Sequence, residues 1–272
     1  MATPGKIGRI AYCIGLTGMV VPQLFYGKIS SSFLPAWPGL PWVPLWTWIF
    51  SLFTIAACVA IALDIKGRSM ALVLAGLLSA MIVCGHLTFE LFIDQGRYHL
   101  FSWGGLLTGL AITGGAFVVA GSFTDESANT KAPMIRLLGK LIVFGPIFFC
   151  ITIVAYGCFH FVYPDGVLTL FPGWIPFKLF WTYFFGVALV LVGLAIILHI
   201  KPGLTAILLG IMLLMFLIII HIPLAIADPL GANAFQLSRI FGALAFSATA
   251  FLIAFNSSPK GLPPKSHRSL TD

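Results

Sequence analysis

The sequence predicts an all-α fold: a polytopic transmembrane helical bundle of about eight spans, built as two parallel four-helix repeats. Composition, the distribution of apolar segments and an internal repeat lead to this prediction. Of the 272 residues, 60% are hydrophobic and only 8% are charged, whereas soluble globular proteins carry about 25% charged residues. A chain with so few charges is expected to expose most of its surface to lipid.

Eight apolar segments are each long enough to cross a bilayer, which takes about 20 helical residues. Each must be helical, because lipid offers no hydrogen-bond partners to an open backbone. In chain order they cover residues 7–27, 44–64, 69–91, 101–122, 135–161, 177–199, 203–226 and 235–255, separated by charged, proline-rich or glycine-rich breaks. Lys6 and Arg9 precede the first apolar run, but no small-residue cleavage site follows it. We therefore expect a retained helix rather than a signal peptide.

An internal repeat divides the chain into two similar halves. A shift of 135 positions places Pro41 on Pro176, Trp46 on Trp181, Thr47 on Thr182, Phe50 on Phe185, Lys66 on Lys201 and His86 on His221. Matches of Ala or Leu are expected by chance in an apolar chain, but Trp, His, Lys and Pro are scarce here. We infer a first repeat over 1–123, a polar linker over 124–134, a second repeat over 135–256 and a tail over 257–272.

The number of helices and the positions of basic residues predict the orientation. Four helices per repeat is an even number, so the copies are parallel and related by an axis along the membrane normal. One side of the membrane receives eleven Lys and Arg residues, and the other receives only Lys28, Arg97, Lys178 and Arg239. Because basic residues concentrate in cytoplasmic loops, both termini, the linker and the tail are expected in the cytoplasm, and the membrane is expected to be a bacterial inner membrane.

Several function classes are excluded by the sequence. The net charge of +7 comes from scattered single residues, which argues against nucleic acid as a partner and leaves the lipid bilayer as the expected one. The five cysteines form no C-x-x-C pair, so a thiol–disulfide relay and a structural zinc site are not expected. No metal site is predicted, because the histidines lack ligand spacing.

Two histidines are the candidate catalytic residues. His86 and His221 occupy equivalent positions near the outward end of the third helix of each repeat. Glu90 follows His86 by four residues and Asp94 by eight, which places the three near one helical face. A histidine and a carboxylate one turn apart can share a proton. The second repeat has Ala225 at the position of Glu90, so the predicted site is asymmetric.

A structural role is the alternative for both histidines. Each ring can donate a hydrogen bond to a backbone carbonyl at a kinked helix end, and Pro223 frees such a carbonyl near His221.

Candidate ligand-binding residues lie at the same outward end. His160 is flanked by Tyr163, Tyr26 occupies the matching position in the first repeat, and Asp228 follows His221 by seven residues. Such groups suit the wall of a quinone site, and they equally suit an interfacial aromatic belt. The proline- and tryptophan-rich segments 34–44 and 170–176 likewise predict either an interfacial cap or a lid over a cavity.

The segment 171–186, FPGWIPFKLFWTYFFG, with the basic turn at Lys201 and the pair His221 and Pro223, resembles DoxX-like membrane proteins. The resemblance is strongest over 170–255 and recurs more weakly in the first half, so each repeat resembles one four-helix family unit. It implies quinone-linked oxidation of sulfur compounds, membership of a membrane redox assembly, or chaperoning of other membrane proteins. The glutamate common in the second helix of the family unit is absent here, where Ser51 and Gly186 stand.

Three functions follow as hypotheses. The first is a redox-associated subunit that binds quinone, as its possible cofactor, or a small sulfur compound near the outward face. The second is a non-enzymatic accessory or assembly subunit that packs against other membrane subunits. The third is a carrier of a small solute or lipid, for which the spans hold few polar residues. The sequence fits both an enzyme and a non-enzymatic protein.

Overall fold

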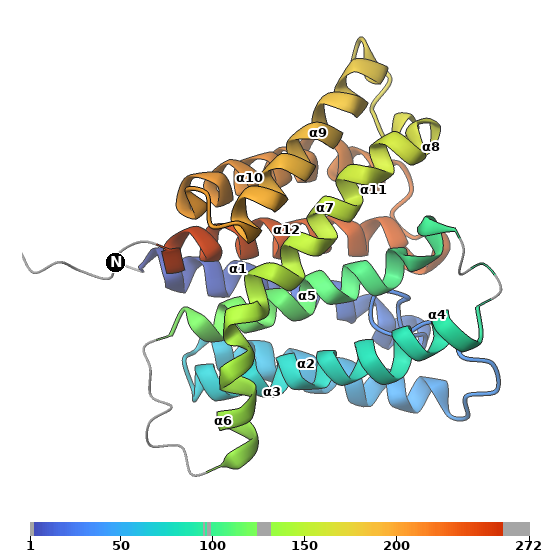
Figure 1. The fold of residues 1–272 in the computed structure, drawn as a ribbon. Coiled ribbons are helices and arrows are strands. Elements are labelled where there is room, and N and C mark those ends of the chain that lie inside the picture. The colour runs from blue at the N-terminus through green and yellow to red at the C-terminus, as the bar shows by residue number, and fades with distance from the viewer. Residues whose placement is uncertain (1–2, 95, 97–98, 124–131, 258–272) are drawn as a thin grey trace, which may run out of the picture.

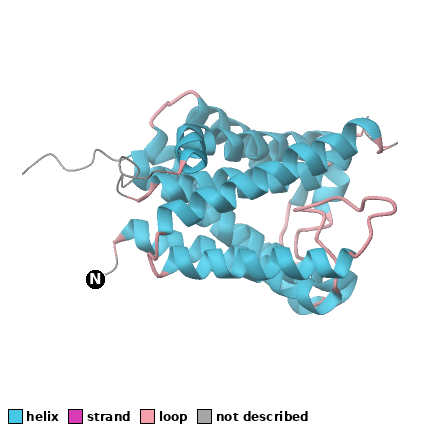
Figure 2. Cartoon of the chain, turned by 90° about the horizontal axis from the view of Figure 1, so that it is seen from below, coloured by secondary structure: helices cyan, strands magenta, loops and turns pink. Residues whose placement is uncertain are grey.

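The computed structural model describes residues 3–94, 96, 99–123 and 132–257 (Figure 1). Within these residues every regular element is a helix, and eight helical segments are long and apolar enough to cross a membrane (Figure 2). The predicted polytopic helical bundle is thereby confirmed. Most of the predicted linker, 124–131, and nearly all of the predicted tail, 258–272, lie outside the described residues.

The first four spans follow one another through short connections. The first, second and fourth are α1 (Pro4–Tyr26), α2 (Val43–Ala62) and α5 (Gly104–Gly121), which the 3₁₀ turn η2 (Leu100–Trp103) precedes. The third is composite, because α3 (Gly67–Ala80) continues through the π-helical segment η1 (Met81–Leu87) into α4 (Thr88–Phe92).

The last four spans repeat this plan with two additions. The fifth consists of α6 (Pro133–Lys140), the 3₁₀ turn η4 (Leu141–Phe144) and α7 (Gly145–Val162). The short α8 (Pro164–Leu168) precedes the sixth span, α9 (Lys178–Ile197). The seventh is again composite, with α10 (Pro202–Phe216), the π-helical segment η5 (Leu217–His221) and α11 (Ile222–Ala227), and the eighth is α12 (Gly231–Ser257).

Unusual backbone conformations recur at the spacing of the sequence repeat. Left-handed residues other than glycine are uncommon, yet Trp42 and Phe177, Asp64 and His199, and Lys66 and Lys201 form three such pairs, each separated by 135 positions. The first and last pairs directly precede a helix in each half. The two π-helical segments also lie at equivalent positions. These features support the inferred duplication with evidence that is independent of residue identity.

The helix neighbours follow a related pattern in the two halves. In each half the first span packs on the second, the second on the third and the third on the fourth. The halves meet where α1 packs on α12 and α5 packs on α7, and α5 and α12 touch each other between these pairs. The start of α1 and the end of α12 lie at the same end of the bundle (Figure 1). We call the opposite end, where α1 ends and α12 begins, the distal end.

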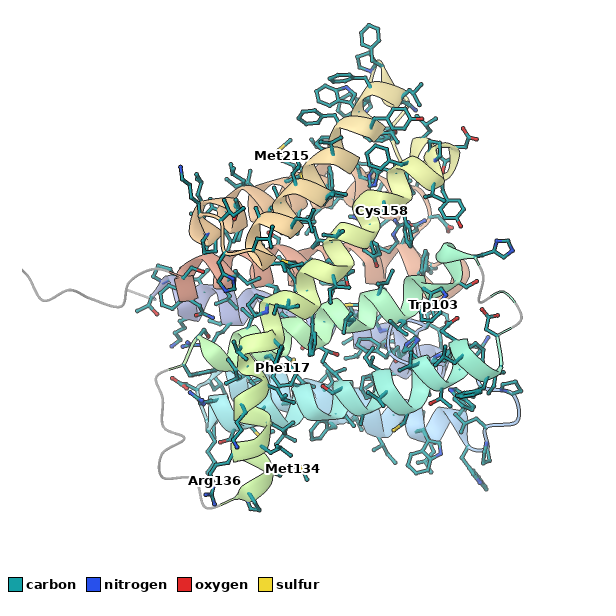
Figure 3. All side chains as sticks on the ribbon, in the orientation of Figure 1. Trp103, Phe117, Met134, Arg136, Cys158 and Met215 are labelled. Atoms are coloured by element: carbon teal, nitrogen blue, oxygen red, sulfur yellow. The ribbon has the colours of Figure 1, made fainter. Side chains whose placement is uncertain are left out.

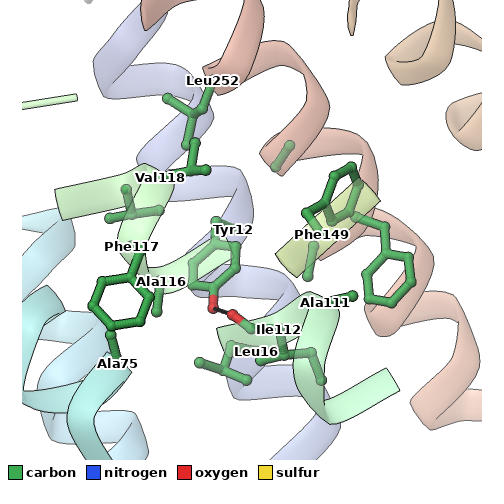
Figure 4. Packing of buried hydrophobic residues seen from close by; sticks show 14 of the residues in the cluster. Tyr12, Leu16, Ala75, Ala111, Ile112, Ala116, Phe117, Val118, Phe149 and Leu252 are labelled. Atoms are coloured by element: carbon green, nitrogen blue, oxygen red, sulfur yellow. Dashed lines mark hydrogen bonds between the residues drawn. The ribbon is translucent and has the colours of Figure 1, made fainter. Parts of the chain in front are cut away.

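Glycines allow the halves to approach closely. A Cβ at Gly15 of α1 would lie 2.7 Å from the backbone of Ala245 in α12, and a Cβ at Gly114 of α5 would lie 2.6 Å from the Gly145 carbonyl oxygen in α7. Small residues permit such contact between membrane helices. Tyr12, Leu16, Phe117 and Phe149 fill the space beside these contacts and form the centre of the buried core (Figure 4).

The outer surface of the bundle is apolar, as a lipid-facing surface requires. Helix α9 exposes Leu179, Phe180, Phe184 and Leu191, and Met215 projects outward from α10 (Figure 3). Helix α6, which carries Met134 and Arg136, packs on α3 near the end that holds the chain termini and has no buried residue (Figure 3).

Candidate functional site

A cavity of about 210 Å³ lies between the two halves at the distal end. We call it the α1–α12 cavity. Its walls come from the last turns of α1, the segment that follows α1, and the first turns of α12. The lining residues are Pro22, Gln23, Tyr26, Lys28, Ile29, Ser30, Ser31, Phe235 and Ser238. None of them is acidic, and most offer a hydroxyl, an amide or an ammonium group.

Gln23 is the most unusual of the lining residues. Its side chain is only 4% exposed, and its Nε2 donates a hydrogen bond to the Met19 carbonyl at 3.2 Å. Its Oε1 is buried and has no hydrogen-bond partner within the described part of the chain. A buried acceptor without a partner costs about 1–3 kcal/mol. A ligand that donates a hydroxyl hydrogen to Oε1 would remove this cost.

The segment after α1 enters the bundle instead of crossing its surface. Phe33 is buried and packs on Phe50 of α2, with 5.0 Å between ring centroids. The Ser31 carbonyl oxygen would lie 2.5 Å from a Cβ at Gly105, and the Ser32 carbonyl oxygen would lie 2.7 Å from a Cβ at Gly109. Two glycines of α5 therefore create the space for this backbone. Lys28, Ile29, Ser30 and Ser31 form one wall of the cavity, and the chain continues from this wall to the buried Phe33.

His86 and Glu90 lie behind this wall, both in the interior of the protein. His86 is 1% exposed and Glu90 4% exposed. The His86 ring lies against Gly105 and beside the backbone of Phe33. Among the described residues, neither ring nitrogen of His86 has a hydrogen-bond partner, and Glu90 Oε2 has none either. The Glu90 carboxyl group instead interacts with that of Asp94, one turn further on. Glu90 and Asp94 thus lie together as expected, whereas the proximity of His86 to these carboxylates stays a prediction.

The π-helical segment η1 explains how His86 reaches this position. A π turn inserts an extra residue into a helix and is frequent at functional sites. His86 is the penultimate residue of η1, and the helix continues directly into α4, which carries Glu90. The histidine therefore turns toward α5 while the span stays continuous.

His221 has different surroundings from its sequence equivalent. It ends η5, which packs on α12, and its Nδ1 is buried without a hydrogen-bond partner among the described residues. Its charged neighbour is Arg239 of α12, and the buried Ala225 stands where the first half has Glu90. The structure does not bring His86 and His221 together, because each packs on the fourth span of its own half. His221 Nδ1 forms no carbonyl bond among the described residues. The His86 ring interacts with the Phe33 backbone without meeting hydrogen-bond geometry, so a structural role for His86 stays a prediction.

Of the four predicted ligand-binding residues, only Tyr26 lines the cavity. The His160 Nδ1 lies 2.8 Å from the Tyr156 carbonyl oxygen of its own helix, which is a local structural bond. Tyr163 follows the last residue of α7 and packs on Phe159, with 6.1 Å between ring centroids. Asp228 is exposed, and its carboxylate lies against Gly231 at the start of α12.

Three residues of the distal end gain importance only from the structure. Gln23 and Lys28 line the cavity, and Arg239 lies near it in α12. The sequence alone could have marked Arg239 as a candidate site residue, since a cation inside an apolar segment usually marks a functional position. The sequence alone could not mark Gln23 and Lys28 as site residues, because polar residues near the end of a span also suit the membrane interface.

The proline- and tryptophan-rich segments lie mainly on the surface. Trp42 is 75% exposed and Trp174 is 72% exposed, as an interfacial cap requires. The interior of the bundle is covered instead by residues 30–34, which precede most of the first proline- and tryptophan-rich segment. A second, apolar groove of about 340 Å³ lies on the outer face beside η1, lined by Leu34, Trp37, Leu40, Ala80, Met81, Cys84 and Gly85.

No cluster of three or more His, Cys, Asp or Glu side chains suited to a metal ion occurs in the part of the chain that the structure describes. Comparisons with known proteins found no matching family model, no similar curated protein and no similar solved structure. The DoxX-like resemblance therefore stays a prediction, and any proposed function depends on the site itself.

Proposed function

We propose that the protein is a redox-associated membrane subunit that binds a quinol-type ligand in the α1–α12 cavity. The unpartnered acceptor of the buried Gln23 carries this proposal. A quinol bears a hydroxyl group that would donate a hydrogen bond to Gln23 Oε1 once the carboxamide turns this buried oxygen toward the cavity. Fully deprotonated sulfur oxyanions such as sulfate and thiosulfate are acceptors only, so an unpartnered acceptor favours the hydroxylated ring over these anions.

The remaining lining residues suit such a ring. Lys28, Ser30 and Ser31 supply donors for the opposite ring oxygen, and Phe235 and Tyr26 supply aromatic surface. Ligand sites in proteins commonly combine apolar walls with a few polar groups that fix orientation. The volume of about 210 Å³ limits the site to the ring, so the apolar tail of the ligand would extend into the bilayer.

The cavity wall formed by Ser30 and Ser31 lies between the cavity and the predicted proton-handling groups. Ser31 lines the cavity and contacts Gly105, and Gly105 contacts the His86 ring. Oxidation of a quinol would pass its electrons to an acceptor in a partner subunit of the redox assembly and release its protons. The unpartnered imidazole of His86, with Glu90 behind it, lies on the other side of this wall. We assign proton transfer to His86 and Glu90, with His221 as the second candidate.

Ligand binding tests the cavity directly. The protein is reconstituted in nanodiscs and titrated calorimetrically with a short-chain benzoquinol kept reduced. Gln23→Leu is expected to weaken binding at least about tenfold, since one hydrogen bond to the ring is lost. Thr54→Val is the matched control, because Thr54 Oγ1 is also buried and unpartnered among the described residues but belongs to α2 and does not line the cavity. Equal affinity of the Gln23→Leu protein would refute the proposal.

Proton handling is tested separately from binding. The double variant His86→Phe, His221→Phe is expected to keep quinol affinity and to lose quinol-dependent electron transfer in membranes. Unchanged electron transfer in this variant would exclude both histidines from that role. A detergent-purified sample with a stable partner protein and no quinol would favour the accessory function instead.

A further inference from the structure

Arg239 is a cation within the eighth span that has no carboxylate partner among the described residues. The side chain is partly buried in α12, and its electrostatic neighbours are Tyr156 and His221, neither of them acidic. The nearest acidic residue along the chain does not serve it, since Asp228 lies exposed against Gly231. A charged side chain at membrane depth normally pairs with an opposite charge or faces water.

The contacts of Arg239 leave its hydrogen-bond donors unused. The guanidinium carbon lies 5.6 Å from the centroid of the Phe235 ring, and an aromatic face attracts a cation without accepting its five N–H groups in directed bonds. No hydrogen bond of Arg239 is found within the described residues, and His221 Nδ1 beside it is buried and unpartnered. Arg239 and His221 thus lie near one another, and apart from the Tyr156 oxygen no acceptor for Arg239 or for His221 Nδ1 is found among the described residues.

The Tyr156 hydroxyl lies near Arg239, and its hydrogen already takes part in a bond within the protein. Its oxygen lies 2.6 Å from Thr108 Oγ1, which donates to the Gly104 carbonyl at 2.8 Å. The Tyr156 hydrogen must therefore point to Thr108. This network holds α7 on α5 and fixes the position of the phenol next to Arg239.

The two halves differ at this place. The residue 135 positions before Arg239 is Gly104, and beside it the backbone of Ser31 enters the bundle against Gly105. In the second half the corresponding connection forms α8, which packs on α7 and α9. A Cβ at Gly104 itself would meet no atom within 4 Å, so the first half leaves this position without a side chain and the second half presents a cation there.

We propose that Arg239 and His221 form a binding site for a phosphate-type oxyanion at the distal end of α12 and η5. The planar guanidinium offers two parallel N–H groups to two oxygens of the anion, and the imidazole N–H offers a third donor. The anion is either the headgroup phosphate of an acidic lipid or free inorganic phosphate. The site is adjacent to the α1–α12 cavity, since Phe235 lines that cavity and lies under Arg239, but it does not depend on quinol binding.

Two binding measurements distinguish the sources of the anion. Native mass spectrometry in detergent measures retention of phosphatidylglycerol against phosphatidylcholine. Phosphorus NMR of the protein in phosphatidylcholine nanodiscs measures binding of inorganic phosphate. We expect Arg239→Gln to lower affinity for the anion that binds at least about tenfold, while Arg136→Gln, an exposed cation of α6 at the other end of the bundle, leaves it unchanged.

Each result decides the proposal. Retention of phosphatidylglycerol alone, lost in Arg239→Gln, assigns the site to a lipid headgroup, and saturable phosphate binding lost in the same variant assigns it to the free ion. No selective binding by the wild type, or binding that Arg239→Gln leaves intact, overturns the site. If Arg239→Gln does not fold, Arg239→Lys keeps the charge but removes the paired N–H groups, and His221→Leu removes the third donor. Wild-type affinity in both of these variants also overturns the site.

Discussion

The Tyr12 hydroxyl donates a hydrogen bond to the Ile112 carbonyl oxygen across 2.7 Å (Figure 4). The bond joins α1 to α5 across 100 positions of the chain, and both residues are fully or almost fully buried. It lies in the core where the two halves meet, and so it offers a direct probe of that packing.

We expect Tyr12→Phe to lower the free energy of unfolding by about 0.5–1.5 kcal/mol, because one buried hydrogen bond is lost with little change in volume. Thermal unfolding in detergent measures the change. Tyr183→Phe is the control, since Tyr183 is 40% exposed on α9. If Tyr12→Phe lowers the free energy of unfolding no more than Tyr183→Phe does, the hydrogen bond does not stabilise the packing of α1 on α5.

The close contact between α5 and α7 predicts that a larger residue at Gly114 lowers stability. The atoms nearest to a Cβ at Gly114 would be backbone atoms of α7 and the Phe148 Cβ, which cannot move aside cheaply. Gly114→Ala is expected to cost about 1–3 kcal/mol through forced separation of the helices. Gly139→Ala is the matched control, because a methyl group added at Gly139 would meet no atom within 4 Å. The better helix propensity of alanine should make that change neutral or stabilising.

Arg9 supports the end of the bundle that holds the chain termini. Its guanidinium donates to the Ser122 carbonyl at 3.2 Å and lies 4.0 Å above the Phe123 ring. We expect Arg9→Met to destabilise the protein by about 1–3 kcal/mol, since a charge-assisted bond and the ring contact are lost together. Unfolding titrations check this, with Lys6→Met, an exposed neighbour on α1, as the control. Equal stability of the Arg9→Met and Lys6→Met variants would show that the contacts of Arg9 do not stabilise the fold.

Substitution of His86 is expected to have the opposite effect on stability to substitution of Tyr12. Because its ring nitrogens have no hydrogen-bond partner among the described residues, His86→Leu should leave stability unchanged or raise it by up to about 1–3 kcal/mol. Electron transfer with quinol should fall in the same variant. A large loss of stability would mean that a strong structural bond holds the ring, and would remove the reason to treat His86 as a functional residue.

The predicted orientation can be tested with terminal reporters. The positions of Lys and Arg predict that both termini are cytoplasmic, so a fluorescent protein fused after residue 272 should be fluorescent and an alkaline phosphatase fusion inactive. The same pair of fusions at residue 1 should behave identically, because eight spans return the chain to the starting side. Active phosphatase at either terminus would reverse the orientation.

The sequence by itself determined the helical class and the eight spans. In lipid, each long apolar segment must satisfy its own backbone hydrogen bonds by forming a helix. The apolar segments, such as 44–64 and 203–226, were therefore sufficient to predict the number and order of the membrane-spanning helices. The recurrence of scarce residues also pointed to equivalent positions such as Lys66 and Lys201, which share an unusual backbone conformation. Both inferences depend on local chain properties alone.

Only the tertiary structure decided which polar residues meet. Gln23 became a site candidate because α12 closes a cavity against it, and His86 and His221 diverged because one faces Gly105 and the other faces Arg239. These contacts join positions far apart in the chain, and an inserted π turn rotates the residues that follow by about 100°. Spacing along a helix therefore could not predict the neighbours of these side chains, since helix rotation and non-local packing set them.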